Sequence, residues 1–444
     1  MEAVGDGGMT RLYLIRHAEA EGNLYRVAHG HCNGLITNYR GYQQIDALRE
    51  RFRKVDIDAV YSSDLYRTQI TARAIWLPKA LPLHLEPAFR EICMGEWEDH
   101  TWHELNVKYP EEMYNFNRRA DLWRVPGAET AQQVVDRFIP ALECVARAHE
   151  GGTAAVFSHG MALRTVLGVL QGQTLAEVGQ TPHGDNTAVS LLEWENGTFR
   201  VVYRDDNSHL TERGLSTFAR QSWWKEKNMV ESGEGYGPLP EEKRAALGMP
   251  AGGEATGVWY GEALIGAFCL SDEVDALRLS WYGLTPQWRG KGLGIPPMGQ
   301  AVDACLRRGR DILRVDCPDK GLRLFFARLG FVPTAGDTME KDVRRVLPPV
   351  PAAIPAAHPS PWCPPPWAQS PAARRTAAAP CPGSPPAGYP SPAAGRRQQP
   401  VPWVGYPGPS LAIAESGRTS SAAGRPPRRT GRRLRSAPRR TTHR

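Results

Sequence analysis

The sequence predicts a three-layer α/β domain, followed by a smaller α+β domain and a disordered tail. Short apolar runs, beginning with residues 12–15, indicate buried strands, and they alternate with helical stretches over the first half of the chain. A length of 444 residues exceeds that of one ordinary domain. A polar stretch with several glycines and prolines then separates a second group of strands from the first.

The first domain is expected to alternate strands and helices. The expected strands are residues 12–15, 59–61, 83–89, 154–157, 188–194 and 199–203. The expected helices are 42–55, a helix that carries Arg67, 131–148 and a helix that begins at Met161. Ser63 or Asp64 is expected to cap the helix with Arg67, because both side chains accept hydrogen bonds from backbone N–H groups. An Asn-Gly pair at 196–197 predicts a hairpin between the last two strands.

The charge of the chain is unevenly distributed. Residues 346–444 contain 14 arginines, no lysine and one acidic residue, and they carry a net charge of +13. The rest carries −6, so the folded part is expected to be mildly acidic despite the overall charge of +7. The eight cysteines form no CxxC pair, which favours neither a disulfide framework nor a zinc site. With no long apolar run and an acidic, Gly-rich start, the sequence predicts a cytoplasmic protein without a membrane partner.

Basic side chains follow three of the predicted strands. Arg16 and His17 end the first strand, Arg67 lies on the helix after the second, and His159 follows a later one. The carboxyl edge of an open α/β sheet is where ligands bind. An arginine can donate two hydrogen bonds to two oxygens of one phosphate, and a neutral histidine is a good nucleophile near pH 7. These positions therefore indicate a site for a phosphate group.

Five motifs in order strengthen this hypothesis. They are LIRHAEAEGN at 14–23, YSSDLYRTQITA at 61–72, REICMGEWE at 90–98, PGAET at 126–130 and FSHGMALRT at 157–165. Together they resemble the histidine phosphatase superfamily, which includes cofactor-dependent phosphoglycerate mutases and small broad-specificity phosphatases. The resemblance covers residues 9–212 and implies a three-layer histidine phosphatase (phosphoglycerate mutase-like) domain.

The resemblance implies a role for each matching residue. His17 would be the nucleophile that becomes phosphorylated, and Glu91 would donate a proton to the leaving group. The residues expected to bind the phosphoryl oxygens are Arg16, Asn23, Arg67 and His159. Neither a metal nor another cofactor is expected for this chemistry.

The proton donor and the overall reaction each have an alternative. Glu96 and Glu98 lie close to Glu91, but only Glu91 directly follows the 83–89 strand. The expected reaction is metal-independent hydrolysis of a small phosphorylated metabolite through phosphohistidine. Phosphoryl transfer of the phosphoglycerate mutase type would use the same residues and is the alternative.

A second group of elements is predicted between residues 254 and 345. Strands are expected within 257–270, at 277–284 and at 312–316, and a helix at 298–307. The sequence RGKGLG precedes this helix, and such a glycine-rich turn can direct backbone N–H groups at an anion. This order, with FFARLGF at 325–331, resembles a GNAT-type acetyltransferase.

The GNAT-like resemblance implies acetyl-coenzyme A (acetyl-CoA) as the cofactor of an N-acetyltransferase, with Arg289, Gly292 and Gly294 near its pyrophosphate. Two features depart from the family pattern. Phe326 stands where the family usually has a tyrosine that protonates the departing thiolate, and prolines 296 and 297 fall in the first turn of the helix. A coenzyme A-binding protein with residual phosphatase activity is a further alternative for the whole chain.

The predicted organisation has five parts. They are a disordered leader at 1–8, the phosphatase-like domain at 9–212, a helix (218–227) and linker at 213–253, the GNAT-like domain at 254–345 and a disordered tail at 346–444. The polar linker predicts that the two domains fold separately. The tail holds 23 of the 38 prolines and cannot bury enough apolar surface to fold. A nucleic-acid-binding arm and out-of-frame translation are alternatives for the tail, but no specific nucleic acid partner is expected, and the oligomeric state is left open.

Overall fold

A six-stranded mixed sheet forms the centre of the first domain, with the strand order β3-β2-β4-β1-β5-β6. The strands are β1 Thr10–Arg16, β2 Ala59–Ser62, β3 Leu83–Leu85, β4 Thr153–Ser158, β5 Val189–Glu195 and β6 Thr198–Asp206. Strand β1 runs parallel to β4 on one side and antiparallel to β5 on the other. This computed structural model describes residues 8–32, 34–37, 40–181, 183–218 and 234–344.

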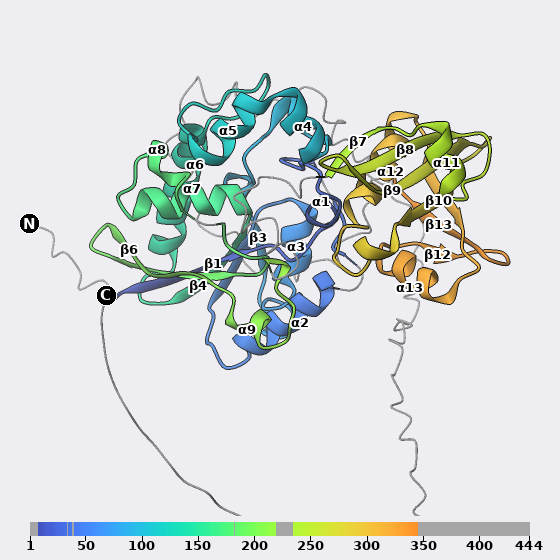
Figure 1. Cartoon of the computed structure of the whole chain (residues 1–444). Coiled ribbons are helices and arrows are strands. Elements are labelled where there is room, and N and C mark those ends of the chain that lie inside the picture. Colours follow the sequence, from blue (N-terminus) through green and yellow to red (C-terminus); the bar gives the residue numbers. More distant parts are fainter. Residues whose placement is uncertain (1–7, 33, 38–39, 182, 219–233, 345–444) are drawn as a thin grey trace, which may run out of the picture. The chain divides into compact units, whose positions relative to one another are not determined.

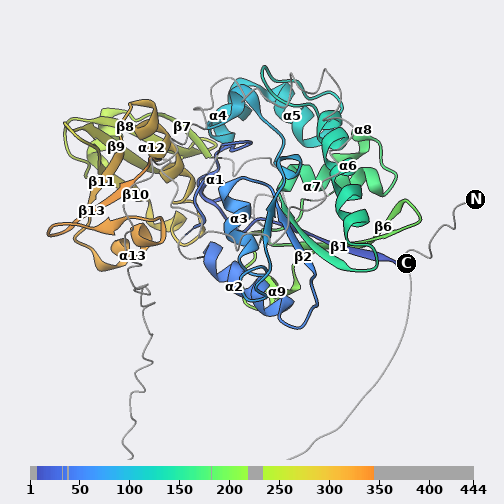
Figure 2. The same ribbon diagram turned by 180° about the vertical axis from the view of Figure 1, so that it is seen from behind.

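Helices cover both faces of this sheet, which gives the domain three layers (Figures 1 and 2). Leu12 and Leu14 of β1 pack in one apolar cluster with α6 (Ala131–Ala148) and α7 (Gly160–Leu170). Ile15 faces the other side and packs with α2 (Arg40–Phe52) and α3 (Tyr66–Ala72). This alternation follows from the two-residue repeat of a strand. The remaining helices are α1 Glu21–Tyr25, α4 Trp102–Lys108, α5 Pro110–Arg118, α8 Leu175–Val178 and α9 Ser208–Thr211.

Helix α6 shows how the local sequence sets an element. Thr130 precedes it, and its hydroxyl oxygen accepts a hydrogen bond from the backbone N–H of Gln133 at 3.2 Å. The Gln133 side chain accepts in return from the Thr130 N–H at 2.8 Å. This capping box satisfies N–H groups that a helix start leaves unpaired. The helix has the bounds that the sequence predicts.

Two local expectations differ from the structure. The strand predicted at 83–89 ends at Leu85, because Pro87 has no N–H for the sheet, and residues Pro87–Phe89 form a 3₁₀ turn instead. Neither Ser63 nor Asp64 caps α3, whose N-cap residue is Leu65. The Ser63 hydroxyl bonds to His159, and Asp64 pairs with Arg90.

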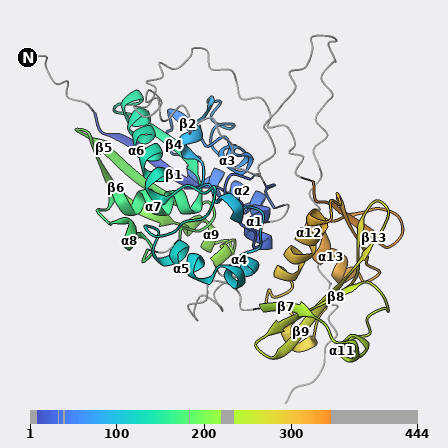
Figure 3. The same ribbon diagram turned by 90° about the horizontal axis from the view of Figure 1, so that it is seen from above.

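A second sheet follows, with seven strands in the order β12-β13-β11-β10-β9-β8-β7. The strands are β7 Glu234–Pro238, β8 Glu254–Tyr260, β9 Ala263–Asp272, β10 Leu277–Leu284, β11 Ile312–Asp316, β12 Val332–Pro333 and β13 Thr338–Asp342. The helices are α11 Glu241–Ala246, α12 Pro296–Arg307 and α13 Lys320–Arg328. Figure 3 shows where α11, α12 and α13 lie around this sheet. Phe268 and Leu270 of β9 pack in one apolar cluster with residues of α12 and α13, while Ala267 and Cys269 belong to a separate cluster, where Cys269 contacts Arg244 of α11.

The second sheet begins earlier in the chain than the sequence suggests. Strand β7 lies within the expected linker and pairs with β8 as the edge of the sheet. Its sequence, Glu-Gly-Tyr-Gly-Pro, resembles a linker, but an edge strand tolerates glycine and proline. The helix expected at 218–227 and the tail at 346–444 lie outside the described residues, apart from Phe218, as does the leader apart from Gly8.

The described residues all fall within one compact unit of the chain. Within this unit, Leu24 and Tyr25 of α1 belong to the apolar cluster of the second sheet, although α1 follows the central strand of the first. Among the residues that the structure describes, none of the helices has the length and apolar character needed to cross a membrane.

Candidate active site

The candidate site lies where β1 and β4 end. These parallel strands pair in a register that places Arg16 opposite Ser158, and the backbone N–H of His17 donates to the Ser158 carbonyl at 3.0 Å. The histidines that follow the two strands, His17 and His159, are therefore neighbours. Their ring centroids are 5.3 Å apart, and both rings are buried.

A cleft of about 130 Å³, open to solvent, lies over these strand ends. The predicted site residues that line it are Arg16, His17, Asn23, Arg67 and Glu91. Three arginines, Arg16, Arg26 and Arg67, line the described cleft, and Glu91 is the one carboxylate among the lining residues. The described cleft is therefore suited to a strongly anionic group.

The His17 ring is held in one tautomer. Its Nδ1 lies 2.7 Å from the carbonyl oxygen of Ala18, and since a carbonyl only accepts, Nδ1 carries the proton. The lone pair is then on Nε2. Burial, and next the charges of Arg67 and Arg16, hold the pKa of His17 well below its ordinary value of 6.5. The ring is consequently neutral at pH 7 and able to act as a nucleophile.

Arg67 joins the second histidine to the loop at residues 30–32. Its Nε donates to Nδ1 of His159 at 3.1 Å, and its terminal nitrogens donate to the carbonyls of Cys32 and Gly30, each at 2.8 Å. Each terminal nitrogen keeps a second N–H, so the guanidinium can still bind phosphate. Burial is the main cause that lowers the pKa of Arg67 to about 10, which leaves it charged at pH 7.

His159 lies behind the cleft wall. Because Nδ1 accepts from Arg67, the proton is on Nε2, which lies 2.7 Å from the Ser63 hydroxyl. Both ring nitrogens thus have protein partners in this structure, and Nδ1 joins His159 to Arg67. Direct contact of His159 with the phosphoryl group stays a prediction from the sequence.

Arg16 enters the cleft from the end of β1. One terminal nitrogen donates to the carbonyl of Gly184 at 2.6 Å, while the buried Nε has no partner among the described residues. A Cβ added at Gly160 would lie 3.1 Å from that Nε, so the glycine lets the start of α7 approach the guanidinium closely. A buried N–H without a partner is costly, and a phosphoryl oxygen would satisfy it.

Glu91 is held at the N-terminus of α7, facing the cleft. Its carboxylate accepts from the backbone N–H groups of Met161 at 3.0 Å and Ala162 at 2.8 Å. The alternatives are less well placed: Glu96 is exposed, and Glu98 accepts from the N–H groups of His31 and Met94. Neither of these two lines the cleft. The geometry therefore favours Glu91 as the acid.

Asn186 is a residue that sequence reasoning missed. Its side-chain N–H₂ donates to the carbonyl of His17 at 3.0 Å and to Oδ1 of Asn23 at 3.2 Å. Asn23 Oδ1 also accepts from the N–H of Ala20 at 3.1 Å, which leaves its own N–H₂ to face a ligand. Further unpredicted cleft residues are Arg26, Val27, His29, Trp102, Phe116 and His183. No local pattern marks them, because they meet only in three dimensions.

The residues predicted to hold acetyl-CoA lie in the turn between β10 and α12. Gly292 adopts φ +79°, a conformation that favours glycine, and Gly290 does the same with φ +75°. At Gly294 a Cβ would make only ordinary contacts with Phe325, so the turn does not require glycine there. Arg289 is exposed, and its Nε donates to the carbonyl of Leu284 at 2.8 Å.

In the part of the chain that the structure describes, no three His, Cys, Asp or Glu residues lie close enough together to hold a metal ion.

Comparison with known proteins assigns the first domain to a family. The profile of the histidine phosphatase superfamily (branch 1) matches residues 12–207. Phosphoserine phosphatase 1 of Hydrogenobacter thermophilus is 30% identical over 207 residues, which are 46% of this chain and 96% of that protein. The metal-independent phosphoserine phosphatase of Arabidopsis thaliana is 31% identical over 215 residues, 47% of this chain and 86% of that protein.

Two further similarities concern a mutase and a solved structure. The probable phosphoglycerate mutase GpmB of an Enterobacter species is 30% identical over 217 residues, 48% of this chain and all of that protein. The structure of Bacillus stearothermophilus YhfR is 29% identical and covers 45% of this chain and 99% of its own, with a TM-score of 0.44. The chain belongs to the histidine phosphatase superfamily and is an enzyme of phosphoryl chemistry.

Proposed function

We propose that the protein hydrolyses a small phosphomonoester through a phosphohistidine at His17, without a metal ion. One arrangement carries the proposal: a neutral imidazole lies in an open cleft beside the buried guanidinium groups of Arg16 and Arg67. A phosphate ester carries about two negative charges, which such groups hold in place as charge develops on the leaving oxygen. The similar proteins named phosphoserine phosphatases support a small phosphorylated metabolite as the substrate.

The proposed reaction has two steps. Nε2 of His17 attacks phosphorus, the bond to the ester oxygen breaks, and Glu91 gives its proton to that oxygen. Water then attacks the phosphorus of the phosphohistidine, Glu91 accepts a proton from the water, and inorganic phosphate leaves a neutral His17. Arg16, Arg67 and Asn23 bind the phosphoryl oxygens throughout, and His159 orients Arg67 through Nδ1.

A trapping experiment tests the intermediate. Wild type mixed briefly with a phosphorus-labelled monoester should carry label on histidine that is lost in acid and kept in base, and His17→Ala should carry none. His84→Ala is a matched control, because His84 lies at β3 and stacks on Tyr61 outside the cleft. Label that persists in His17→Ala would disprove the mechanism.

Phosphoglycerate mutase-type transfer is the alternative, and the similar proteins named probable phosphoglycerate mutases support it. We favour hydrolysis because the cleft is open to solvent, so water can reach the phosphohistidine. With p-nitrophenyl phosphate, a chelator and no bisphosphoglycerate, wild type should release free phosphate. Rapid mutase turnover with negligible phosphate release would favour the alternative.

We propose in addition that the second domain binds coenzyme A. Parallel strands β10 and β11 pair at only three positions, 277–279 with 313–315, and β10 then continues to Leu284. The glycine-rich turn follows directly. In the described chain, none of the backbone N–H groups of residues 290–294 donates a hydrogen bond. These unpaired donors support an anion site at the turn.

The helix after the turn limits what this site can contribute. Pro296 and Pro297 occupy the first positions of α12, so two of its first N–H groups are missing and a pyrophosphate would rest on the turn itself. Phe326 is buried and has no hydroxyl to protonate a thiolate. N-Acetyl transfer from acetyl-CoA is thus the less supported form of the proposal, and simple binding the more supported one.

Calorimetric titration of the full chain with coenzyme A and with acetyl-CoA tests this second proposal. Wild type should bind, and Gly292→Glu should not, because a carboxylate would face the pyrophosphate. Gly261→Glu is a matched control, since Gly261 also has a positive φ but lies in the β8–β9 turn. Binding by wild type with phosphatase turnover no faster than that of His17→Ala would favour a coenzyme A-binding protein with residual phosphatase activity.

We also propose a cytoplasmic location. The free thiols of Cys269, Cys305 and Cys317 support it, because such thiols are typical of a reducing compartment.

A further inference from the structure

Helix α1 links the phosphatase cleft to the second domain. It has five residues and carries Asn23, and a helix of that length is not stable without tertiary contacts. Its large apolar side chains, Leu24 and Tyr25, are only 7% and 3% exposed. Both belong to the apolar cluster of the second sheet and to neither cluster of the first domain. The burial that stabilises α1 is therefore supplied mainly by the second domain.

Polar contacts also hold α1 against the second domain. The Tyr25 hydroxyl donates to the carbonyl of Leu329, at the end of α13, at 2.5 Å. Nζ of Lys341 on β13 lies 2.6 Å from the Glu21 carboxylate and 5.4 Å from the centroid of the Tyr25 ring. Lys341 is only 4% exposed. Burial alone would lower the pKa of Lys341. The neighbouring Tyr25 and Glu21 outweigh this effect and raise the pKa above its ordinary value, so the ammonium remains charged.

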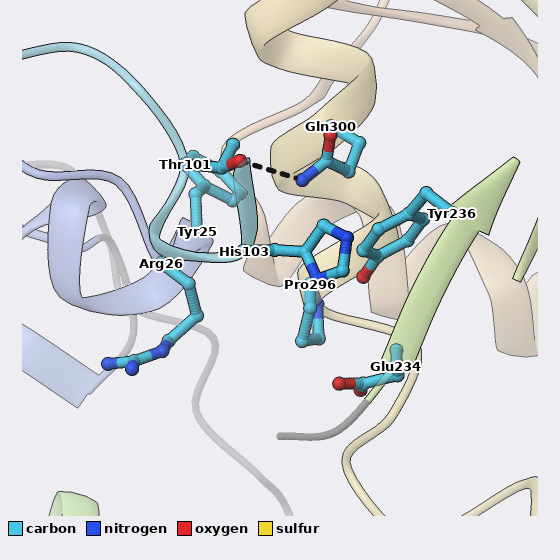
Figure 4. Close-up of a pocket in the computed structure, with 8 residues that line it drawn as sticks. All are labelled: Tyr25, Arg26, Thr101, His103, Glu234, Tyr236, Pro296 and Gln300. Carbon is cyan, nitrogen blue, oxygen red and sulfur yellow. Dashed lines mark hydrogen bonds between the residues drawn. The ribbon is translucent and has the colours of Figure 1, made fainter. Parts of the chain in front are cut away.

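The backbones also approach closely. A Cβ added at Gly299 of α12 would clash with the carbonyl oxygen of Tyr25, so only glycine allows this contact. The next residue, Gln300, donates to the Thr101 hydroxyl at 3.0 Å, as the dashed line in Figure 4 shows. The small pocket in Figure 4 is lined from both domains, with Tyr25 and Thr101 on one side and Pro296 and Gln300 on the other.

Helix α1 is also connected to His17, the proposed nucleophile. Asn23 lies between Leu24 and the cleft residue Gly22 on α1, and its Oδ1 bonds to Ala20 and to Asn186, which also holds the His17 carbonyl. The direction in which the Asn23 amide points therefore depends on where α1 is held.

We propose that the second domain completes the phosphatase cleft, with Tyr25 and Lys341 as positioning residues that act through Asn23. The inference rests on the proposed hydrolysis at His17. Loss of either contact frees α1 to shift, and Asn23 then contacts the phosphoryl group less well in both the ground state and the transition state. Such a loss of uniform binding raises KM and leaves kcat nearly unchanged.

Full-length Lys341→Met and Tyr25→Phe test the inference with p-nitrophenyl phosphate. We expect KM to rise roughly tenfold while kcat changes by less than about threefold. Lys320→Met is the matched control, because Lys320 is exposed at the start of α13 and makes no contact with α1 among the described contacts; its KM should equal that of wild type. Tyr25→Phe removes a single hydroxyl, so it still tests the positioning role if Lys341→Met does not fold.

A double-mutant cycle separates positioning from general destabilisation. In an Asn23→Ala background, Lys341→Met and Tyr25→Phe should each change KM by less than about twofold, because the residue they act through is gone. An equal effect in both backgrounds, or an unchanged KM in folded single variants, would overturn the inference. Failure of the proposed function itself is distinguishable: wild type would then release no phosphate and form no phosphohistidine.

Discussion

The two sheets carry their candidate sites in contrasting ways. At the ends of β1 and β4, the charged and titratable groups are buried: Arg67 is 2% exposed, and His17 is 5% exposed. At the turn after β10, Arg289 is exposed and Gly290 has open space around it. Burying cations is costly, so the first arrangement indicates a site whose charged groups are fixed in advance for charge stabilisation. The second offers backbone donors that a ligand would have to organise.

Strand pairing shows the same difference. Strand β1 pairs with β4 over residues 11–16 and with β5 over residues 10–15, so Arg16 and His17 lie at the end of a strand that is fixed on both sides. Strand β10 pairs with β11 over three positions only and has a register shift between Leu279 and Trp281. Strands that are well paired on both sides hold reacting groups more accurately than strands that separate from a neighbour. The comparison predicts large effects of substitutions at the first site and small effects on phosphatase rate at the second.

The largest effect is expected for the nucleophile. His17→Ala should lower kcat/KM roughly 10⁴-fold or more, because the covalent step is lost. Steady-state phosphate release measures this, with thermal unfolding to verify that the variant is folded. A fall of less than about tenfold would place the covalent step elsewhere and remove the contrast between the two sites.

The acid is expected to come next. Glu91→Gln keeps the acceptor oxygen at the start of α7 but cannot give a proton, so hydrolysis of an alkyl phosphate should slow about 10²–10⁴-fold. p-Nitrophenolate leaves readily without a proton, so p-nitrophenyl phosphate should be affected much less. Glu98→Gln serves as the control for the competing carboxylate. Equal losses for both esters would exclude Glu91 as the proton donor.

A smaller effect concerns pH and stability. Burial, and next the charge of Arg67, hold the pKa values of both His17 and His159 well below 6.5. Below that pH the unfolded chain binds protons that the folded chain does not, so the free energy of unfolding should fall as the pH falls.

Urea unfolding of wild type and His17→Ala at about pH 7.5 and about pH 5.5 measures this effect. The midpoint should fall on acidification in both proteins, and by less in the variant, which lacks one of the two buried histidines. An equal fall of the midpoint in both proteins would contradict the lowered pKa of His17.

The smallest effect is expected at the second site. Gly292→Glu should leave the phosphatase rate within about twofold of wild type, because Gly292 makes no contact with α1 among the described contacts and independent sites rarely couple strongly. The rate assay is run on the same samples as the coenzyme A titration. A larger loss of phosphatase activity would mean that the turn itself, and not only α12, supports the cleft.

Much of the first site could be anticipated, because its residues follow strands. Parallel neighbours end at one edge, so Arg16, His17 and His159 had to meet once β1 and β4 paired in register. The contacts of α1 could not be anticipated, since Tyr25 and Leu329 are 304 residues apart and no local pattern joins them. Strand β7 was hidden by its glycines and proline, which local propensity assigns to a linker. The polar linker likewise suggested two separately folding domains, whereas the apolar cluster of the second sheet includes side chains of α1.

The bond between Glu21 and Lys341 also sets an order of events during synthesis. These residues are 320 positions apart, so α1 leaves the ribosome long before its partner is made. At roughly 5–20 residues per second, the helix waits on the order of 15–60 s for β13. The nascent first domain can form its sheet in that time, but α1 beside the cleft still lacks its contact with Lys341. A newly made chain would therefore gain its full affinity for substrate only when translation has passed residue 341.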